Sequence, residues 1–103
     1  MRDGLRVPIY AITSGTYDEL IEKARHGLAP ILRPSPGFVF YSTTDVGGGR
    51  FVSVSTWESR EQAETAAARS AEWVSENMAG AVTLEENLIG EMTTLTATDR
   101  SAV

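Results

Sequence analysis

The residues best suited to binding a small molecule alternate along one predicted strand. Every second side chain of an extended segment points to the same face, and from position 51 to 57 these are Phe51, Ser53, Ser55 and Trp57. Two small hydroxyl groups between two large aromatic rings are unusual in a closely packed core. They leave space beside apolar surfaces and offer hydrogen bonds, so we expect Ser53, Ser55 and Trp57 to line a ligand pocket.

The helix predicted after this strand presents small residues to the same space. Its expected inner face consists of Ala63, Ala66, Ala67, Ser70, Trp73, Val74 and Asn77. Small side chains either let a helix lie directly on the sheet or leave a cavity above it, and the sequence allows both arrangements. In the second arrangement Trp57 and Trp73 wall the cavity, and Tyr41 of the preceding strand offers its hydroxyl group to the ligand.

His26 is the only histidine of the chain, and histidine is the commonest proton-transfer residue near neutral pH. In a catalytic site it would act as the general base that deprotonates a phenol. On the predicted helix it follows Glu22 by four residues, which equally fits a solvated surface residue beside a carboxylate.

We expect no metal ion and no cofactor. The chain has no cysteine, which removes disulfides, thiolate nucleophiles and cysteine-bound metals. Its acidic clusters, at 18–22 and 85–91, are explained by the first turn of a helix and by a solvated strand edge. The run Gly47–Gly49 precedes a strand and not a helix, so it predicts a hairpin tip and not a phosphate-binding loop.

Composition indicates one globular domain. The chain has 103 residues, of which 42% are hydrophobic and 22% charged. A net charge of −5 without a basic run disfavours nucleic acid as a partner. The apolar run after the charged N-terminal residues is short and contains Pro8, so we expect neither a signal peptide nor a membrane span and place the protein in the cytoplasm.

The residue patterns predict the element order β-α-β-β-α-β. Strands are expected at 7–13, 38–43 and 51–57, and a last one within 82–95, mainly from Leu88 onward. One helix begins after a capping box of Thr16 and Glu19 and is interrupted near Leu28; another is capped by Ser59, with a second capping box, and ends near Gly80. The predicted domain spans 7–95, with an N-terminal arm at 1–6 and a flexible tail at 96–103.

This order predicts an α+β, ferredoxin-like fold. Right-handed crossovers place both helices on one face of a four-stranded antiparallel sheet. The first strand is nevertheless apolar on both faces, because Val7 and Ile9 alternate with Tyr10 and Ile12. A sheet with one solvated face would alternate apolar and polar residues. We therefore expect a second copy of the chain to cover the open face in a homodimer.

With these elements the sequence resembles the antibiotic biosynthesis monooxygenase-like family of the dimeric α+β barrel superfamily. The resemblance rests on Pro36-Gly37-Phe38 opening the second strand, on Trp57-Glu58-Ser59 ending the third, and on the element order. It implies a pocket between sheet and helices to which Trp57 contributes. Quinone-forming members carry an asparagine four residues before this tryptophan and a tyrosine six residues after it, where this chain has Ser53 and Ala63.

The function implied by the resemblance is a cofactor-independent monooxygenase acting on a small aromatic phenol or hydroquinone, whose anion itself reduces dioxygen. Trp57 would stack on the substrate, His26 would be the base, and Ser53 or Tyr41 would bind the oxyanion. The missing asparagine and tyrosine favour the alternative of a non-catalytic small-molecule-binding or structural homodimer. Haem binding is a weaker third option, because no histidine lies between Arg60 and Gly80.

Overall fold

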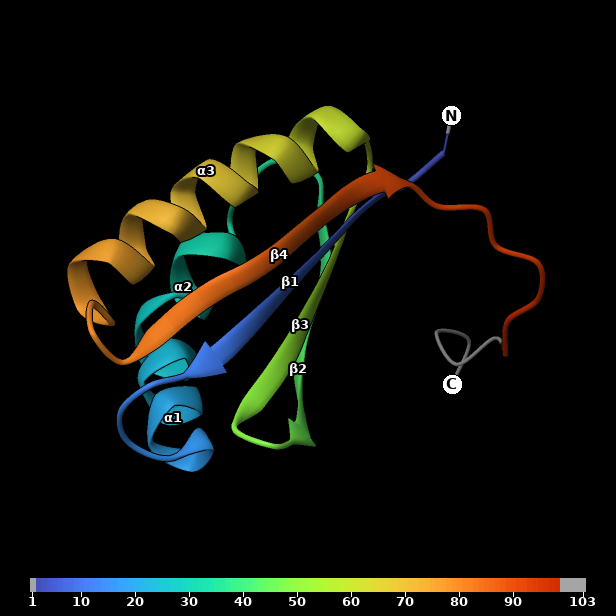
Figure 1. The fold of residues 1–103 in the computed structure, drawn as a ribbon. Coiled ribbons are helices and arrows are strands. Elements are labelled where there is room, and N and C mark those ends of the chain that lie inside the picture. Colours follow the sequence, from blue (N-terminus) through green and yellow to red (C-terminus); the bar gives the residue numbers. More distant parts are fainter. Residues whose placement is uncertain (1, 99–103) are drawn as a thin grey trace.

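The computed structural model describes residues 2–98, which form one antiparallel sheet with helices on a single face (Figure 1). The elements are β1 (Gly4–Ile12), α1 (Tyr17–Gly27), α2 (Ala29–Leu32), β2 (Phe38–Gly47), β3 (Arg50–Trp57), α3 (Arg60–Asn77) and β4 (Val82–Glu91). The strands lie in the order β2-β3-β1-β4, and all neighbours are antiparallel. The ferredoxin-like α+β fold predicted from the element order is thus confirmed.

The first strand begins earlier than the sequence predicts. Gly4 pairs with Trp57 and Arg6 pairs with Ser55, so three residues of the expected N-terminal arm belong to the sheet. Gly4 permits this start because a Cβ atom there would overlap the backbone carbonyl of Ser59, at the beginning of α3. The charged side chain of Arg6 is consequently carried into the interior of the protein.

Two other strands are also longer than predicted. β4 begins at Val82, six positions before Leu88, because Val82 pairs with Ile12 and the ladder runs along the whole of β1. β2 continues to Gly47, and the hairpin turns through Gly47, Gly48 and Gly49, all with positive φ. Three consecutive left-handed residues explain why glycine stands at each position of this turn.

The N-termini of α1 and α3 carry the predicted cap residues, and the full capping box is present at α1. At α1, Thr16 Oγ1 accepts a hydrogen bond from the Glu19 amide (3.2 Å), and the Thr16 amide donates to Glu19 Oε1 (3.1 Å), which completes the capping box. At α3, Ser59 Oγ accepts from the Gln62 amide (3.2 Å). The capping box expected there is not formed, because Gln62 Oε1 is buried without a hydrogen-bond partner and does not reach the Ser59 amide. The expected interruption near Leu28 is confirmed, because α1 ends at Gly27 and the chain continues into the short α2.

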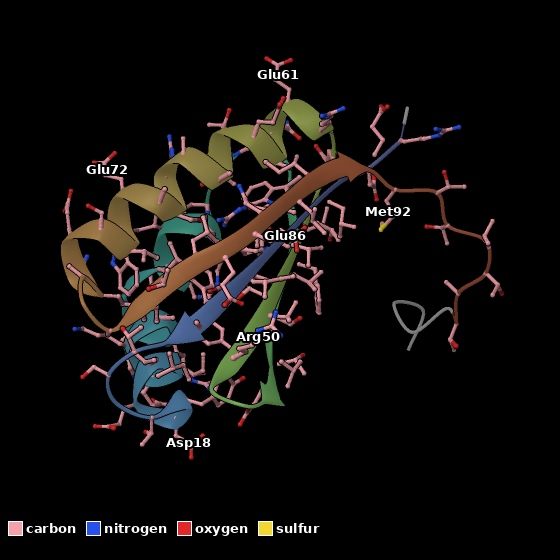
Figure 2. The ribbon with its side chains drawn as sticks, in the orientation of Figure 1. Asp18, Arg50, Glu61, Glu72, Glu86 and Met92 are labelled. Carbon is pink, nitrogen blue, oxygen red and sulfur yellow. The ribbon has the colours of Figure 1, made fainter. Side chains whose placement is uncertain are left out.

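The inner face of α3 consists of small side chains. Ala63, Ala66, Ala67 and Ser70 are buried, while Trp73 and Val74 are partly buried. Glu61 and Glu72 point away from the sheet on the opposite side of the helix (Figure 2). Asn77, expected on the inner face, is instead exposed, because its Nδ2 donates to the carbonyl of Trp73 (2.9 Å).

The core lies between the helices and one face of the sheet, and the other face is open. Along β1 the side chains of Leu5, Val7 and Ile9 point to this open face, opposite to the buried Arg6 and Tyr10. No helix among residues 2–98 covers it, and Phe40 and Leu88 at its sides are 52% and 51% exposed.

Residues 92–98 form neither helix nor strand and leave the body of the domain, with Leu95 90% exposed. The remainder of the predicted tail, 99–103, lies outside the described residues. Within 2–98, none of the helices has the length and apolar character that crossing a membrane requires.

Candidate functional site

A small cavity of about 30 Å³ lies between the sheet and the helices. Its polar lining comes from the sheet and consists of Arg6, Tyr10, Tyr41 and Ser53. Its apolar lining includes Leu28, Phe51, Trp73 and Met78. This volume holds two or three water molecules at roughly 10–15 Å³ each. An aromatic ligand would therefore have to displace side chains.

The polar residues form a row across the inner face of the sheet. Ser55 of β3 pairs with Arg6 of β1 on one side and with Tyr41 of β2 on the other. Ser53 lies two residues further along β3 on the same face. Because serine is small, the longer side chains of Arg6 and Tyr41 have room above it, and both reach the same cavity.

Arg6 is the one charged side chain among residues 2–98 that is buried, with 5% of its surface exposed. Its Nε donates to Asn87 Oδ1 of β4 at 3.0 Å. The ion pairs within the same residues involve Arg25, His26 and Arg50, and none involves Arg6. A buried guanidinium thus lines the cavity without a carboxylate partner from the described chain.

Tyr41 stays neutral to a higher pH than an ordinary tyrosine. Burial raises the pKa of the Tyr41 hydroxyl above its usual value, and the neighbouring Tyr10 adds to this effect. The positive charge of Arg6 and a hydrogen bond with Ser53 act in the opposite direction and do not reverse it. The phenol O–H therefore remains available as a donor at neutral pH.

The indole of Trp73 closes the cavity from the helix side by lying against Gly27 at the end of α1. A Cβ atom at position 27 would overlap the six-membered ring and Nε1 of Trp73, so only glycine allows this close approach. The contact fixes α3 against α1 and sets the height of the ring above the sheet.

A larger groove of about 550 Å³ runs along the outside, between α1, α2 and β2. Its polar lining includes Tyr17, Arg33 and Thr43, and Thr43 Oγ1 is buried without a hydrogen-bond partner. The groove and the cavity share Ile21, Ala24 and Tyr41 as a common wall. Movement of the Ile21 and Tyr41 side chains would join the groove and the cavity. The groove is therefore the expected route by which a ligand enters the cavity.

The structure separates the two tryptophans expected to wall one pocket. Trp57 is 1% exposed, its Nε1 donates to Ser55 Oγ (3.0 Å), and its ring meets Phe38 edge-on at 5.4 Å. Trp57 lines a separate pocket of about 180 Å³ together with Gln62 and Arg69, and it does not line the cavity. Of the predicted ligand-binding residues, the cavity brings together Ser53, Tyr41 and Trp73, while Trp57 and Ser55 bond to each other.

His26 lies on the solvent side of α1. Its side chain is 77% exposed, and its Nε2 lies 3.3 Å from Glu22 Oε2. It lines neither the cavity nor the groove. This position matches the surface-residue interpretation of its spacing from Glu22.

Sequence reasoning missed Arg6, because it assigned residues 1–6 to an arm. The available signal was period two, since Gly4, Arg6, Pro8 and Tyr10 alternate with the apolar Leu5, Val7 and Ile9. If the strand is extended to Gly4, Arg6 falls on the same face as Tyr10. A single charged residue on that face indicates a buried functional group. Among residues 2–98, no group of three His, Asp or Glu side chains is placed to hold a metal ion.

Models of known protein families give no match to the chain, and neither do curated protein sequences. Solved structures do match. SnoaB, a cofactor-independent oxygenase from Streptomyces nogalater, has a TM-score of 0.66 and 14% identity over 97% of this chain and 100% of that chain.

Two further structures have similar scores. A Chloroflexus aurantiacus protein classed as an antibiotic biosynthesis monooxygenase has a TM-score of 0.67 and 14% identity over 92% of this chain and 97% of that one. A dimeric ferredoxin-like protein from an uncultured marine organism has a TM-score of 0.67 and 10% identity, over 93% and 100%. At these identities the likeness establishes the fold alone, and this chain shares the ferredoxin-like α+β fold of these proteins.

Proposed function

We propose that the protein is a cofactor-independent monooxygenase that oxidises a small phenol or hydroquinone in the cavity between sheet and helices. The observation that carries the proposal is the polar row of Arg6, Ser53 and Tyr41 facing the indole of Trp73 across one enclosed space. Likeness in fold to a cofactor-independent oxygenase supports it.

The reaction needs an electron-rich substrate and dioxygen. The phenol loses its O–H hydrogen and one ring C–H hydrogen, a ring carbon gains one oxygen atom, and the second oxygen atom leaves as water, which yields a quinone. The substrate itself supplies the electrons that reduce dioxygen. The protein stabilises the phenolate, orients the ring and excludes water.

The side chains around the cavity have suitable roles. The neutral Tyr41 hydroxyl donates to the phenolate oxygen, with Ser53 as its neighbour. Trp73 and Phe51 provide apolar surfaces for the ring. The substrate enters from the groove past Ile21 and Tyr41, which line both spaces. His26 lies outside these linings, so no step is assigned to it.

The test is oxygen uptake by the purified protein with a panel of anthrone-type phenols, naphthols and hydroquinones. We expect oxygen consumption matched by quinone formation. Tyr41→Phe should lower kcat by about 10²–10³, the typical cost of removing one oxyanion donor. Trp73→Ala should also lower the rate, because the ring of the substrate loses an apolar surface that orients it. Ser75→Ala, on the exposed side of α3, is the control and should leave the rate unchanged. Absence of uptake with every compound would contradict the proposal.

A second candidate function is a non-catalytic homodimer that binds a small molecule or has a structural role. It is favoured by Ser53 and Ala63, which stand where the family resemblance implies an asparagine and a tyrosine. About 30 Å³ does not accommodate an aromatic ring unless side chains move. Native mass spectrometry of the purified protein distinguishes the two functions. A retained, unmodified ligand together with no oxygen uptake would favour the binding protein, and haem would be recognised among such ligands by its mass and its Soret absorption.

The proposed assembly is a homodimer through the open face of the sheet. The face carries Val7, Ile9 and Val54 in its centre, with the exposed Phe40 and Leu88 at its sides. An apolar surface of this kind is rarely left to solvent in a monomer. The fold shared with a dimeric ferredoxin-like protein supports the same assembly.

A further inference from the structure

The buried guanidinium of Arg6 is not explained by the architecture of the protein. Burying a charge is unfavourable unless hydrogen bonds and an opposite charge replace the lost water. In proteins, arginine in such a position is normally paired with a carboxylate or meets a bound anion. Arg6 has no carboxylate partner among residues 2–98, and only 5% of its surface is exposed.

The hydrogen bonds of Arg6 leave most of its donors unused. A guanidinium has five N–H donors, and here Nε donates to Asn87 Oδ1 (3.0 Å) as the one side-chain hydrogen bond of Arg6 within residues 2–98. The terminal nitrogens, which carry the other four donors, form the forked end that matches an oxyanion. Arg6 lines the same cavity as Tyr41 and Ser53.

The neighbours of this forked end are suited to an aromatic oxyanion. Tyr41 contributes an O–H donor, and it shares Ser55 with Arg6 as its partner across the sheet. Phe51, Trp73 and Met78 supply apolar surface above and beside these polar groups. The site therefore offers one positive charge and hydrogen-bond donors at one end, with aromatic and aliphatic contacts beside them.

We propose that Arg6 is an anion-binding residue and that the cavity binds an aromatic molecule with one oxyanion. The oxyanion, which is a phenolate, an enolate or a carboxylate, contacts Arg6, and the ring lies beneath Trp73. The inference rests on the proposed function for the location of the site and adds the charge of the ligand. In the oxidation of a phenol, Arg6 would favour the ionised substrate, which is the electron-rich form.

The first experiment compares two probes of the same shape, 2-naphthoate and its neutral analogue 2-naphthamide, by calorimetry and by quenching of tryptophan fluorescence. We expect wild-type protein to bind the acid at least tenfold more tightly than the amide. Arg6→Met should abolish this preference. Arg60→Gln removes the same charge from an exposed position outside the cavity and should retain it. Equal affinity for both probes in the wild type would overturn the proposal.

A second variant tests Arg6 without removing it. Asn87→Asp places a carboxylate oxygen where Asn87 Oδ1 now accepts from Arg6 Nε, so it gives the guanidinium an internal counter-ion. We expect a higher melting temperature and at least a tenfold loss of 2-naphthoate affinity. If Asn87→Asp leaves the affinity for 2-naphthoate unchanged, the proposal is wrong even where Arg6→Met does not fold.

The two proposals fail separately. If the protein prefers the acid but consumes no oxygen, the anion site is supported and the monooxygenase proposal is contradicted. If the protein consumes oxygen with phenols and Arg6→Met does not change the rate, the monooxygenase proposal is supported and the anion site is contradicted. A titration of 2-naphthol followed by its absorbance adds a direct readout, because the bound phenol should ionise at lower pH in the wild type than in Arg6→Met.

Discussion

Arg6 and Tyr41 lie on different strands, yet both pair with Ser55 in the sheet. One small residue therefore brings a permanent cation and a neutral phenol to either side of a single position on the inner face. Neither residue makes a site alone. Their common partner makes the cavity a place where an oxyanion could be bound from two directions.

The two serines of β3 should respond differently to substitution, although they occupy the same face. Ser55 Oγ accepts from the buried Nε1 of Trp57 (3.0 Å), so Ser55→Ala leaves the indole N–H without a partner. We expect a loss of about 1–3 kcal/mol in the free energy of unfolding, measured by urea denaturation. Ser53→Ala should cost less and should weaken ligand binding, because Ser53 lines the cavity beside Tyr41. Equal effects of both substitutions on stability would contradict this division.

Tyr41 should make the protein sensitive to alkaline pH. Its pKa is raised in the folded state above the value of 10.0 expected for an unperturbed tyrosine, so the unfolded chain loses this proton first. The contribution of the group to stability is complete below about pH 10 and falls as the pH rises toward the folded-state pKa. The urea midpoint of the wild type should therefore drop more steeply above about pH 10 than that of Tyr41→Phe. Parallel curves for the two proteins would show that Tyr41 is not the group responsible.

Gly27→Ala should be destabilising, although alanine is the better helix former. The helix-propensity gain of about 1 kcal/mol is outweighed by the overlap of the new Cβ with the ring of Trp73, since overpacking typically costs about 1–3 kcal/mol. The emission of Trp73 should also shift as the ring moves. In a Trp73→Leu background the same substitution should become neutral or stabilising, and a double-mutant cycle measures this coupling.

Val54→Lys should prevent dimer formation. Val54 lies at the centre of the open face, opposite to Ser53 and Ser55, and a lysine there would bring an unpaired charge into the interface. Light scattering after size-exclusion chromatography should give a dimer for the wild type and a monomer for Val54→Lys. Ala68→Lys, on the exposed side of α3, adds the same charge and should remain a dimer. A monomeric wild type would rule out the proposed assembly.

The fold could be predicted from the sequence because its signals are local. The caps at Thr16 and Ser59, the triple glycine and the apolar strands each mark an element, and their order implies the topology. The limits of β1 and β4 could not be predicted in the same way. Arg6 and the acidic residues around Asn87 break the apolar pattern there, and only pairing between the two strands determines their length.

The site was less accessible to sequence reasoning. Period two places Ser53, Ser55 and Trp57 on one face of β3, but it does not say which side chains bond to one another. The Trp57 indole reaches Ser55 on its own strand, and the position of Trp73 depends on the contact between α3 and Gly27. Both facts arise from tertiary packing. The part that Arg6 plays becomes visible only once β1 is seen to start at Gly4.

β1 serves two surfaces at once, with Arg6 directed inward and Leu5 and Val7 directed outward. A strand can lengthen or shorten only by whole residues, and each such step exchanges its faces. A single insertion before Arg6 that shifted the strand by one position would therefore drive the guanidinium into the open face and a valine or leucine into the cavity. An insertion at this point should therefore be tolerated less well than one in the loop that follows the strand.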